Sequence, residues 1–236
     1  MARTPIWSAI AAGLTAEIAN GSYAPGSKLP TEAQLALRFG VNRHTVRHAL
    51  AALAEAELVQ PRRGAGVFVT STPTDYPLGR RVRFHQNVLA SGRSPSRRLL
   101  RSETRPASMA EAAALGLAPG DPVHLVEGVS LVDDVPVGLF RSVLPAVRFP
   151  AFPEAMARLG SITAALAEAG VADYTRASTR LTAKQADAVQ ALHLQVPQGA
   201  PLLRSVTVNV DADARPVEFG TTSFVGDRVT LTIIPE

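Results

Sequence analysis

The sequence of 236 residues contains no cysteine, one tryptophan and only two lysines, Lys28 and Lys184. Without cysteine the chain can form neither a disulfide nor a thiolate metal site, and this fits a reducing cytoplasm, where we expect the protein. No apolar run approaches the roughly 18 residues that a membrane-spanning helix needs, so we expect no membrane span. The first residues carry one arginine and no long apolar core, so we expect no signal peptide.

Motifs of common enzymes are also missing from the sequence. It contains no G-x-S-x-G, no P-loop and no H-E-x-x-H. Glu154, Glu168 and Asp173 show no pairing that indicates general acid–base catalysis. His44 and His48 have the i,i+4 spacing of some metal-binding pairs, but no acidic or third ligand accompanies them. We therefore expect no enzymatic activity, no cofactor and no metal.

The composition is that of a globular protein, with 46% hydrophobic and 19% charged residues. The formal net charge of +4 comes almost wholly from arginine and fits a nucleic-acid partner. The length allows two modest domains. A stretch rich in proline, serine and threonine at 71–79 breaks every periodicity, so we predict a linker there between a domain at 1–70 and a domain at 80–236.

Residues 29–69 have the layout of a winged helix-turn-helix unit: a helix, a tight turn, a second helix and two short strands. Thr31 and Gln34 have the spacing of a capping box, which predicts the start of the first helix. Asn42 can cap the second helix. An amphipathic helix over about 5–20 completes a small three-helix core.

The exposed face of the second helix favours DNA binding. Arg43 and Arg47 are four residues apart and point the same way, and arginine can bind guanine O6 and N7 as a fork. Glycine and arginine at 62–66 join the two strands and can approach phosphates or the minor groove. The ordinary alternative is that any exposed helix carries arginines. The residues that we predict to serve DNA binding are Lys28, Thr31, Gln34, Asn42, Arg43, His44, Thr45, Arg47, Arg62, Arg63 and Gly64.

Three ordered motifs closely resemble the GntR family of bacterial transcription regulators. They are P-G-S-K-L-P-T-E at 25–32, V-N-R-H-T-V-R-H-A-L at 41–50 and R-R-G-A-G-V-F-V at 62–69. The resemblance implies a homodimer that binds double-stranded operator DNA, with each subunit on one half of an inverted repeat.

The remainder contains an internal repeat. Residues 111–140 and 187–220 both show a short helix, a Pro/Gly turn, a long alternating strand, an Asp-rich turn and a second strand that opens with Pro-Val. A helix at 153–169 and a strand at 176–181 lie between the two copies. We predict an α+β domain with one antiparallel sheet, helices on one side of it and pseudo-twofold character.

This arrangement resembles the UTRA effector domain of the HutC branch of GntR regulators, which has a chorismate-lyase-like fold. Residues 75–84 and 86–88 look most like the PhnF type, the regulators of phosphonate uptake and breakdown genes. The resemblance implies a repressor that controls phosphonate or phosphate-ester genes in response to a small anionic effector. The effector-binding residues that it implies are Arg83, His85, Asn87, Ser130, Arg141, Ser161, Thr163, Glu218, Thr222 and Arg228.

Arginine forks and the free amides at a helix start suit phosphate, phosphonate or a similar oxyanion. The ordinary alternatives are surface salt bridges for Arg141 and Arg228 and a simple helix cap for Ser161. Many relatives have Glu at the position of Phe140 and Arg at that of Gly128 or Ser130, and the loss of these groups argues for a small ligand.

Other functions stay open at this point. The effector could be another metabolite, such as a sugar phosphate, an amino-acid catabolite or a carboxylate. A lyase-like enzyme tethered to DNA is a second alternative. A general DNA-compacting protein is a third, and it would show weak sequence preference with a steep salt dependence.

Overall fold

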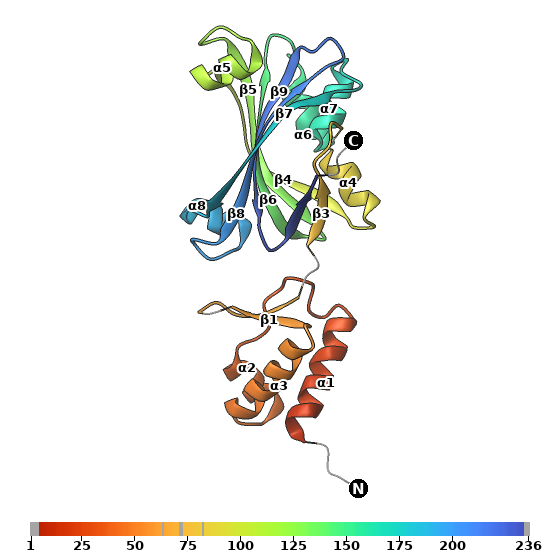
Figure 1. Cartoon of the computed structure of the whole chain (residues 1–236), viewed down its shortest axis with the longest axis vertical. Coiled ribbons are helices and arrows are strands. Elements are labelled where there is room, and N and C mark those ends of the chain that lie inside the picture. Colours follow the sequence, from red (N-terminus) through yellow and green to blue (C-terminus); the bar gives the residue numbers. More distant parts are fainter. Residues whose placement is uncertain (1–4, 63, 71–72, 82, 234–236) are drawn as a thin grey trace. The chain divides into compact units, whose positions relative to one another are not determined.

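The computed structural model describes residues 5–62, 64–70, 73–81 and 83–233 (Figure 1). The chain divides into two compact units, Met1–Thr72 and Pro73–Glu236, which are described separately. No helix in these described ranges is long and apolar enough to cross a membrane.

The first unit is a three-helix domain with a two-stranded wing. Its elements are α1 (Ile6–Ala19), α2 (Glu32–Phe39), α3 (Arg43–Glu55), β1 (Val59–Arg62) and β2 (Gly66–Val69). Leu14, Leu35 and Val46 contribute one fully buried side chain from each helix to the core. The antiparallel pairing of β1 with β2 forms the wing, so the predicted winged helix-turn-helix fold is confirmed.

The caps that the sequence predicts in this unit are formed. The amide of Gln34 donates to the Thr31 hydroxyl, and the Thr31 amide donates back to the Gln34 side chain at 2.8 Å. The Asn42 side chain accepts from the Thr45 amide at 2.8 Å. These bonds satisfy amides at the starts of α2 and α3, which have no partner inside the helix.

The second unit is built on a six-stranded antiparallel sheet in the order β4-β5-β6-β9-β8-β7. The strands are β4 (Pro95–Pro106), β5 (Pro122–Val132), β6 (Val135–Pro145), β7 (Thr175–Gln185), β8 (Pro201–Val210) and β9 (Pro216–Val225). Both predicted hairpins, β5-β6 and β8-β9, are present and pair with each other through β6 and β9. The arrangement has the predicted pseudo-twofold character, because each half contributes an edge strand and a hairpin.

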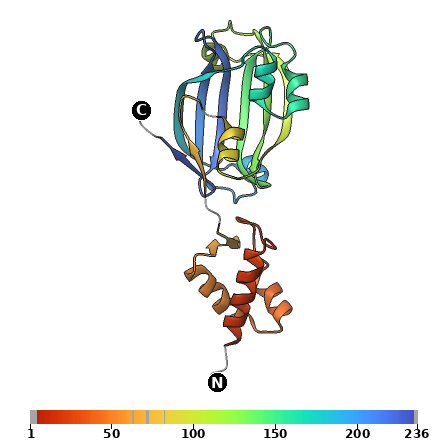
Figure 2. The same cartoon turned by 90° about the vertical axis from the view of Figure 1, so that its right-hand side faces the viewer.

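Helices cover both faces of this sheet, which corrects the prediction of helices on one side. The helices α4 (Phe84–Ala90), α6 (Phe152–Leu159) and α7 (Ile162–Glu168) lie on one face (Figures 1 and 2). The helices α5 (Met109–Leu115) and α8 (Ala188–Leu194) lie on the other. The neighbours Leu125 and Val126 on β5 show why: Leu125 packs into the cluster with α5, and Val126 into the cluster with α6 and α7.

Two local expectations also differ from the structure. The single helix predicted over 153–169 is two helices, because Gly160 adopts a left-handed conformation (φ 62°) that ends α6 before Ser161 starts α7. The predicted linker at 71–79 contains β3 (Thr74–Pro77), which pairs in parallel with β10 (Val229–Thr232) and therefore belongs to the second unit. Residues 71 and 72 lie outside the described residues.

Candidate functional site

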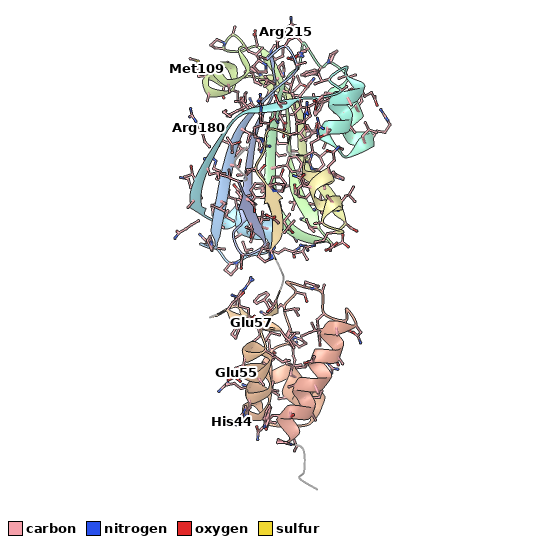
Figure 3. All side chains as sticks on the ribbon, turned by 45° about the vertical axis from the view of Figure 1, so that its right-hand side comes forward. His44, Glu55, Glu57, Met109, Arg180 and Arg215 are labelled. Carbon is pink, nitrogen blue, oxygen red and sulfur yellow. The ribbon has the colours of Figure 1, made fainter. Side chains whose placement is uncertain are left out.

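The start of α3 presents the side chains that were predicted to read DNA. Arg43, His44 and Arg47 are exposed there, and His44 points outward at the start of the helix (Figure 3). Arg47 forms a forked ion pair with Glu32 on α2, with Nη2–Oε2 at 2.7 Å and Nε–Oε1 at 3.0 Å. Hydrogen bonding from Arg47 lowers the pKa of Glu32. The Arg47 fork is thus held in place at the surface and can exchange this carboxylate for a base edge or phosphate.

The wing supplies further positive charge beside this helix. The guanidinium of Arg62 lies 4.5 Å from the centre of the Phe68 ring. Lys28 forms an isolated bridge with Phe68, and a Cβ on Gly66 would lie only 2.7 Å from Lys28 Cε, so glycine allows the lysine to cross the wing. Gly64 has a φ of 73° in the turn between the strands. The predicted contact Arg63 lies outside the described residues.

Thr31, Gln34, Asn42 and Thr45 also belong to the predicted DNA-binding set. Their polar side-chain atoms form the caps described above, with the Thr45 hydroxyl 2.9 Å from Asn42 Oδ1. The structure therefore assigns them a role in positioning α2 and α3, and a direct contact with DNA stays a prediction for them.

The second unit contains a small cavity of about 70 Å³ on the sheet face that α4, α6 and α7 cover. Eight separate elements contribute to its wall, from β3 to β9. The lining residues are Tyr76, Arg83, Phe84, Arg97, Phe140, Ser142, Ile162, Thr163, Tyr174, Arg176, Thr207, Asn209, Glu218, Gly220 and Thr222.

Arg97 and Arg176 in this wall each have a buried nitrogen atom without a hydrogen-bond partner. The Arg97 guanidinium lies 4.7 Å from the centre of the Phe140 ring and 5.6 Å from that of Phe84. Among the described residues it forms no ion pair, and the Nε atoms of both Arg97 and Arg176 are buried without a hydrogen-bond partner. Burial lowers the pKa of Arg97, and the carboxylate of Glu218 opposes this effect. Such poorly solvated positive charge favours the entry of an anion.

A third arginine, Arg83, closes another side of the cavity, and its Nε atom is also buried without a hydrogen-bond partner. It donates to the carboxylate of Asp173, and its guanidinium lies 4.9 Å from the centre of the Tyr174 ring. The Tyr174 hydroxyl is 2.8 Å from Thr163 Oγ1. Burial raises the pKa of both Tyr174 and Tyr76, so each phenol keeps its proton at neutral pH. The wall thus offers neutral hydroxyl donors beside the arginines.

The acidic member of the wall is Glu218 on β9, which is 7% exposed. The Ser142 hydroxyl donates to its Oε1, and the Asn209 side-chain amide donates to its Oε2 at 2.7 Å. These bonds come from β6 and β8 on either side, so they fix the carboxylate at the floor of the cavity.

The structure brings four of the predicted effector residues to this cavity: Arg83, Thr163, Glu218 and Thr222. It does not bring six others to the wall: His85, Asn87, Ser130, Arg141, Ser161 and Arg228.

Arg141 lies on the opposite face of the sheet, because its neighbours Phe140 and Ser142 face the cavity and side chains alternate along a strand. There it pairs with Glu111 at 2.9 Å. The buried Arg228 donates instead to the carbonyl oxygens of Pro136 and Leu194, at 2.6 and 2.8 Å. The expectation that these two arginines share a site with Arg83 is therefore wrong.

The Ser161 hydroxyl accepts a hydrogen bond from the Ala164 amide and caps α7. This is the simple helix cap that was given above as the alternative to effector binding. Ser130 is buried directly opposite Arg97 in the β4–β5 register but does not line the cavity. His85 follows Phe84, which lines the wall. Burial lowers the pKa of His85, and the positive charge of Arg97 lowers it further. The side-chain nitrogen of Asn87 is buried on α4 without a hydrogen-bond partner.

The predicted set of effector-binding residues did not include Arg97 or Arg176, although the internal repeat held a signal for them. Pro122 and Pro201 open equivalent strands of the two copies, and Arg97 and Arg176 are separated by the same number of residues. If each copy of the repeat is extended by the strand that precedes it, Arg97 on β4 and Arg176 on β7 occupy equivalent positions in the two copies.

Phe140 and Gly128, the two positions at which many relatives have Glu and Arg, depend on each other in the structure. A Cβ on Gly128 would lie 2.8 Å from the Phe140 ring and 2.6 Å from the Arg98 carbonyl oxygen. The ring therefore occupies the space of any side chain at 128, which keeps the cavity small.

Comparisons with known proteins agree with this architecture. Residues 7–69 match the family model of bacterial regulatory proteins, gntR family, and residues 90–230 match that of the UTRA domain. The chain is 41% identical to an uncharacterized HTH-type transcriptional regulator of Rhizobium meliloti, over 97% of this chain and 94% of that one. It is 38% identical to the probable transcriptional regulator PhnF of Escherichia coli, over 95% and 92%. The crystal structure of PhnF from Mycobacterium smegmatis superposes with a TM-score of 0.68 and 30% identity, over 96% of this chain and 99% of that one.

Proposed function

Because the chain belongs to the GntR family of bacterial regulatory proteins and carries a UTRA domain, we propose that it is a repressor whose operator binding responds to a phosphonate, a phosphate ester or a related oxyanion. Its relatives are named as transcriptional regulators, and the chain is a regulator rather than an enzyme. The observation that carries the effector class is the presence in one small cavity of Arg97 and Arg176, each with a buried Nε atom that has no hydrogen-bond partner.

The chemistry and size of the cavity support a compact oxyanion. Arginine presents donors in a planar fork that matches phosphate and phosphonate oxygens. A volume of about 70 Å³ holds about five to seven water-sized groups, since one water needs roughly 10–15 Å³. A sugar phosphate is much larger than this space. The likeness to the Escherichia coli protein named PhnF supports a phosphonate among the compact candidates.

For DNA binding, we propose that Arg43, His44 and Arg47 enter the major groove while Lys28 and Arg62 contact phosphates.

Exposed large apolar side chains on the α5 and α8 side of the sheet and on its edge strands support a homodimer. They include Leu100, Met109, Leu181, Val189 and Leu192. Figure 3 shows Met109 on α5 and Arg180 on β7 pointing into solvent.

The element that can connect effector binding to DNA binding is β3. Tyr76 on β3 lines the cavity, and β3 is the first strand that follows the DNA-binding unit along the chain. An effector can change operator affinity only if it binds two arrangements of the dimer with different affinities. We propose that contact with Tyr76 and Arg83 provides this difference.

Calorimetric titration of the full-length protein tests the effector class. The ligands are phosphate, methylphosphonate, 2-aminoethylphosphonate and glucosamine-6-phosphate, and the variant is Arg97→Ala. Arg180→Ala is the control, because Arg180 is an exposed arginine on the strand that also carries Arg176. We expect saturable binding of a compact oxyanion that is lost in Arg97→Ala and kept in Arg180→Ala.

Other outcomes separate the alternatives. Binding of the sugar phosphate alone would retain the regulator and reject the phosphonate class. Unchanged oxyanion binding by Arg97→Ala would reject the cavity as the effector site.

A further inference from the structure

The cavity contains charges of both signs. Among the described residues of its wall, Arg83, Arg97 and Arg176 are cationic and Glu218 is the acidic one. Arg83 is already paired with Asp173 outside the wall, but no ion pair joins Glu218 to any arginine of the described ranges. Its two partners, Ser142 and Asn209, are neutral donors.

A buried carboxylate without a cationic partner costs free energy that an ion pair would offset. If Glu218 served only as the counter-ion of Arg97, a direct contact would be the favourable arrangement. The Arg97 guanidinium lies over the Phe140 ring instead, and the carboxylate is held by bonds from β6 and β8. Because carboxylate oxygens can accept further hydrogen bonds, Glu218 can still receive a donor from a ligand.

The position of Glu218 also breaks the symmetry of the cavity. Arg97 and Arg176 occupy equivalent positions in the two halves, but the equivalent of Glu218, which follows Pro216-Val217, is Gly138, which follows Pro136-Val137. The first half therefore has no carboxylate at this position, and a Cβ on Gly138 would crowd the side chains of Phe224 and Thr222, each 3.3 Å away. The cavity therefore has an arginine in each half but a carboxylate only in the second half. A ligand with an anionic end and a cationic end would bind it in one orientation.

We propose that the effector is a small zwitterion, with its oxyanion on Arg97 and Arg176 and a primary ammonium group on Glu218. This inference rests on the proposed oxyanion site and adds a second recognition group to it. An ammonium group supplies the cationic partner that Glu218 lacks in the described structure, where its two donors are neutral, and it brings three donors for the remaining lone pairs of the carboxylate. Gly220 keeps the floor open beside it, since a Cβ there would lie 3.7 Å from Glu218 Oε1 and 2.8 Å from Thr207 Oγ1.

The experiment compares two ligands that share one anion. Full-length protein is titrated calorimetrically with 2-aminoethylphosphonate and with ethylphosphonate, which lacks only the amine. The wild-type protein should bind the amine about tenfold or more tightly, because a hydrogen bond between charged groups contributes that much. Glu218→Gln, which keeps the shape and removes the charge, should lose this preference while it still binds ethylphosphonate. Asp213→Asn, at an exposed carboxylate in the turn before β9, should keep the preference.

The outcomes distinguish this inference from the proposed function. Equal affinity of the wild-type protein for both ligands overturns the zwitterion, and so does a preference that survives in Glu218→Gln. Ethylphosphonate binding that disappears in Arg97→Ala would leave the oxyanion site in place in either case. Binding of neither ligand would overturn the proposed effector class and the zwitterion together. The wild-type comparison decides the matter even if Glu218→Gln does not fold.

Discussion

The two units use arginine in opposite environments. Arg47 in the first unit has a side chain that is 67% exposed and pairs with Glu32 at the surface. Arg97 in the second unit lies over two aromatic rings, Phe84 and Phe140, and forms no ion pair within the described ranges. A surface pair contributes only about 0–1 kcal/mol, so Arg47 can exchange its partner at little cost. A charge in a poorly solvated cavity is screened much less, so Arg97 can select an anion.

The largest effect that we expect concerns the exposed arginine. Arg47→Ala removes the fork that we propose to read a base, which would be worth about 1–3 kcal/mol, and the proposed homodimer would lose it in both half-sites. Specific operator binding should therefore fall about 30-fold or more, while the thermal unfolding temperature stays nearly unchanged. Binding to operator and to scrambled DNA, measured by fluorescence anisotropy at one salt concentration, checks this. Unchanged affinity and base preference would remove α3 from the recognition role.

The second prediction sharpens the contrast between exposed and buried ion pairs. Glu111 at the start of α5 has a side chain that is 5% exposed and pairs with Arg105 at 2.7 Å. Hydrogen bonding from Arg105 lowers the pKa of Glu111 to about 2. Glu111→Gln keeps the cap but leaves Arg105 without its buried partner, so the free energy of unfolding should fall by about 2–3 kcal/mol. Urea unfolding at neutral pH measures this loss.

The pH dependence of the same pair has a defined sign. The folded-state pKa of Glu111 is below its ordinary value of 4.5, so the ionised carboxylate stabilises the protein above that pH. This contribution is lost as the pH falls through 4.5 toward 2. Stability in that window should depend less steeply on pH in Glu111→Gln than in the wild type, and equal slopes would contradict the assignment.

A smaller effect is expected at the edge of the cavity. Arg83 already has Asp173 as a partner, so its contribution to ligand binding should be less than that of Arg97. Arg83→Ala should weaken effector binding about tenfold, the loss of one charge-assisted hydrogen bond, and leave operator binding without effector unchanged. Titration of effector into the operator complex tests this. A normal response would remove Arg83 from the effector site.

The smallest effect tests whether the surface pair in the first unit is readily exchanged. Glu32→Gln releases the Arg47 fork and removes a negative charge from the DNA-facing side, so operator affinity should rise a few-fold at low salt. The free energy of unfolding should change by less than about 1 kcal/mol. A large loss of stability would show that the pair is structural, and the contrast with Glu111 would then disappear.

The first unit was predicted more completely than the second because its signals are local. The capping box at Thr31 and Gln34 and the cap at Asn42 each join residues three apart in the sequence. The hairpins of the second unit were predicted for the same reason, since each strand pairs with its neighbour along the chain. The helix break at Gly160 was predicted only in part: Ser161 was read as a helix start, but the whole of 153–169 was also read as one helix, because a glycine within a helical pattern does not by itself fix its backbone conformation.

The sequence by itself determined the two-domain organisation, the winged helix-turn-helix unit and the repeat of helix and hairpin, because caps, turns and alternation act over a few residues. Only the tertiary structure decided which arginines meet. Arg97 and Arg176 lie at opposite edges of the sheet and reach one cavity, whereas Arg141 points to the other face. Both faces of the sheet are covered by helices, so the hydrophobic pattern of a strand did not indicate which side chains face the cavity. The strand β3 pairs with β10 from the far end of the described chain, and no local pattern predicts that pairing.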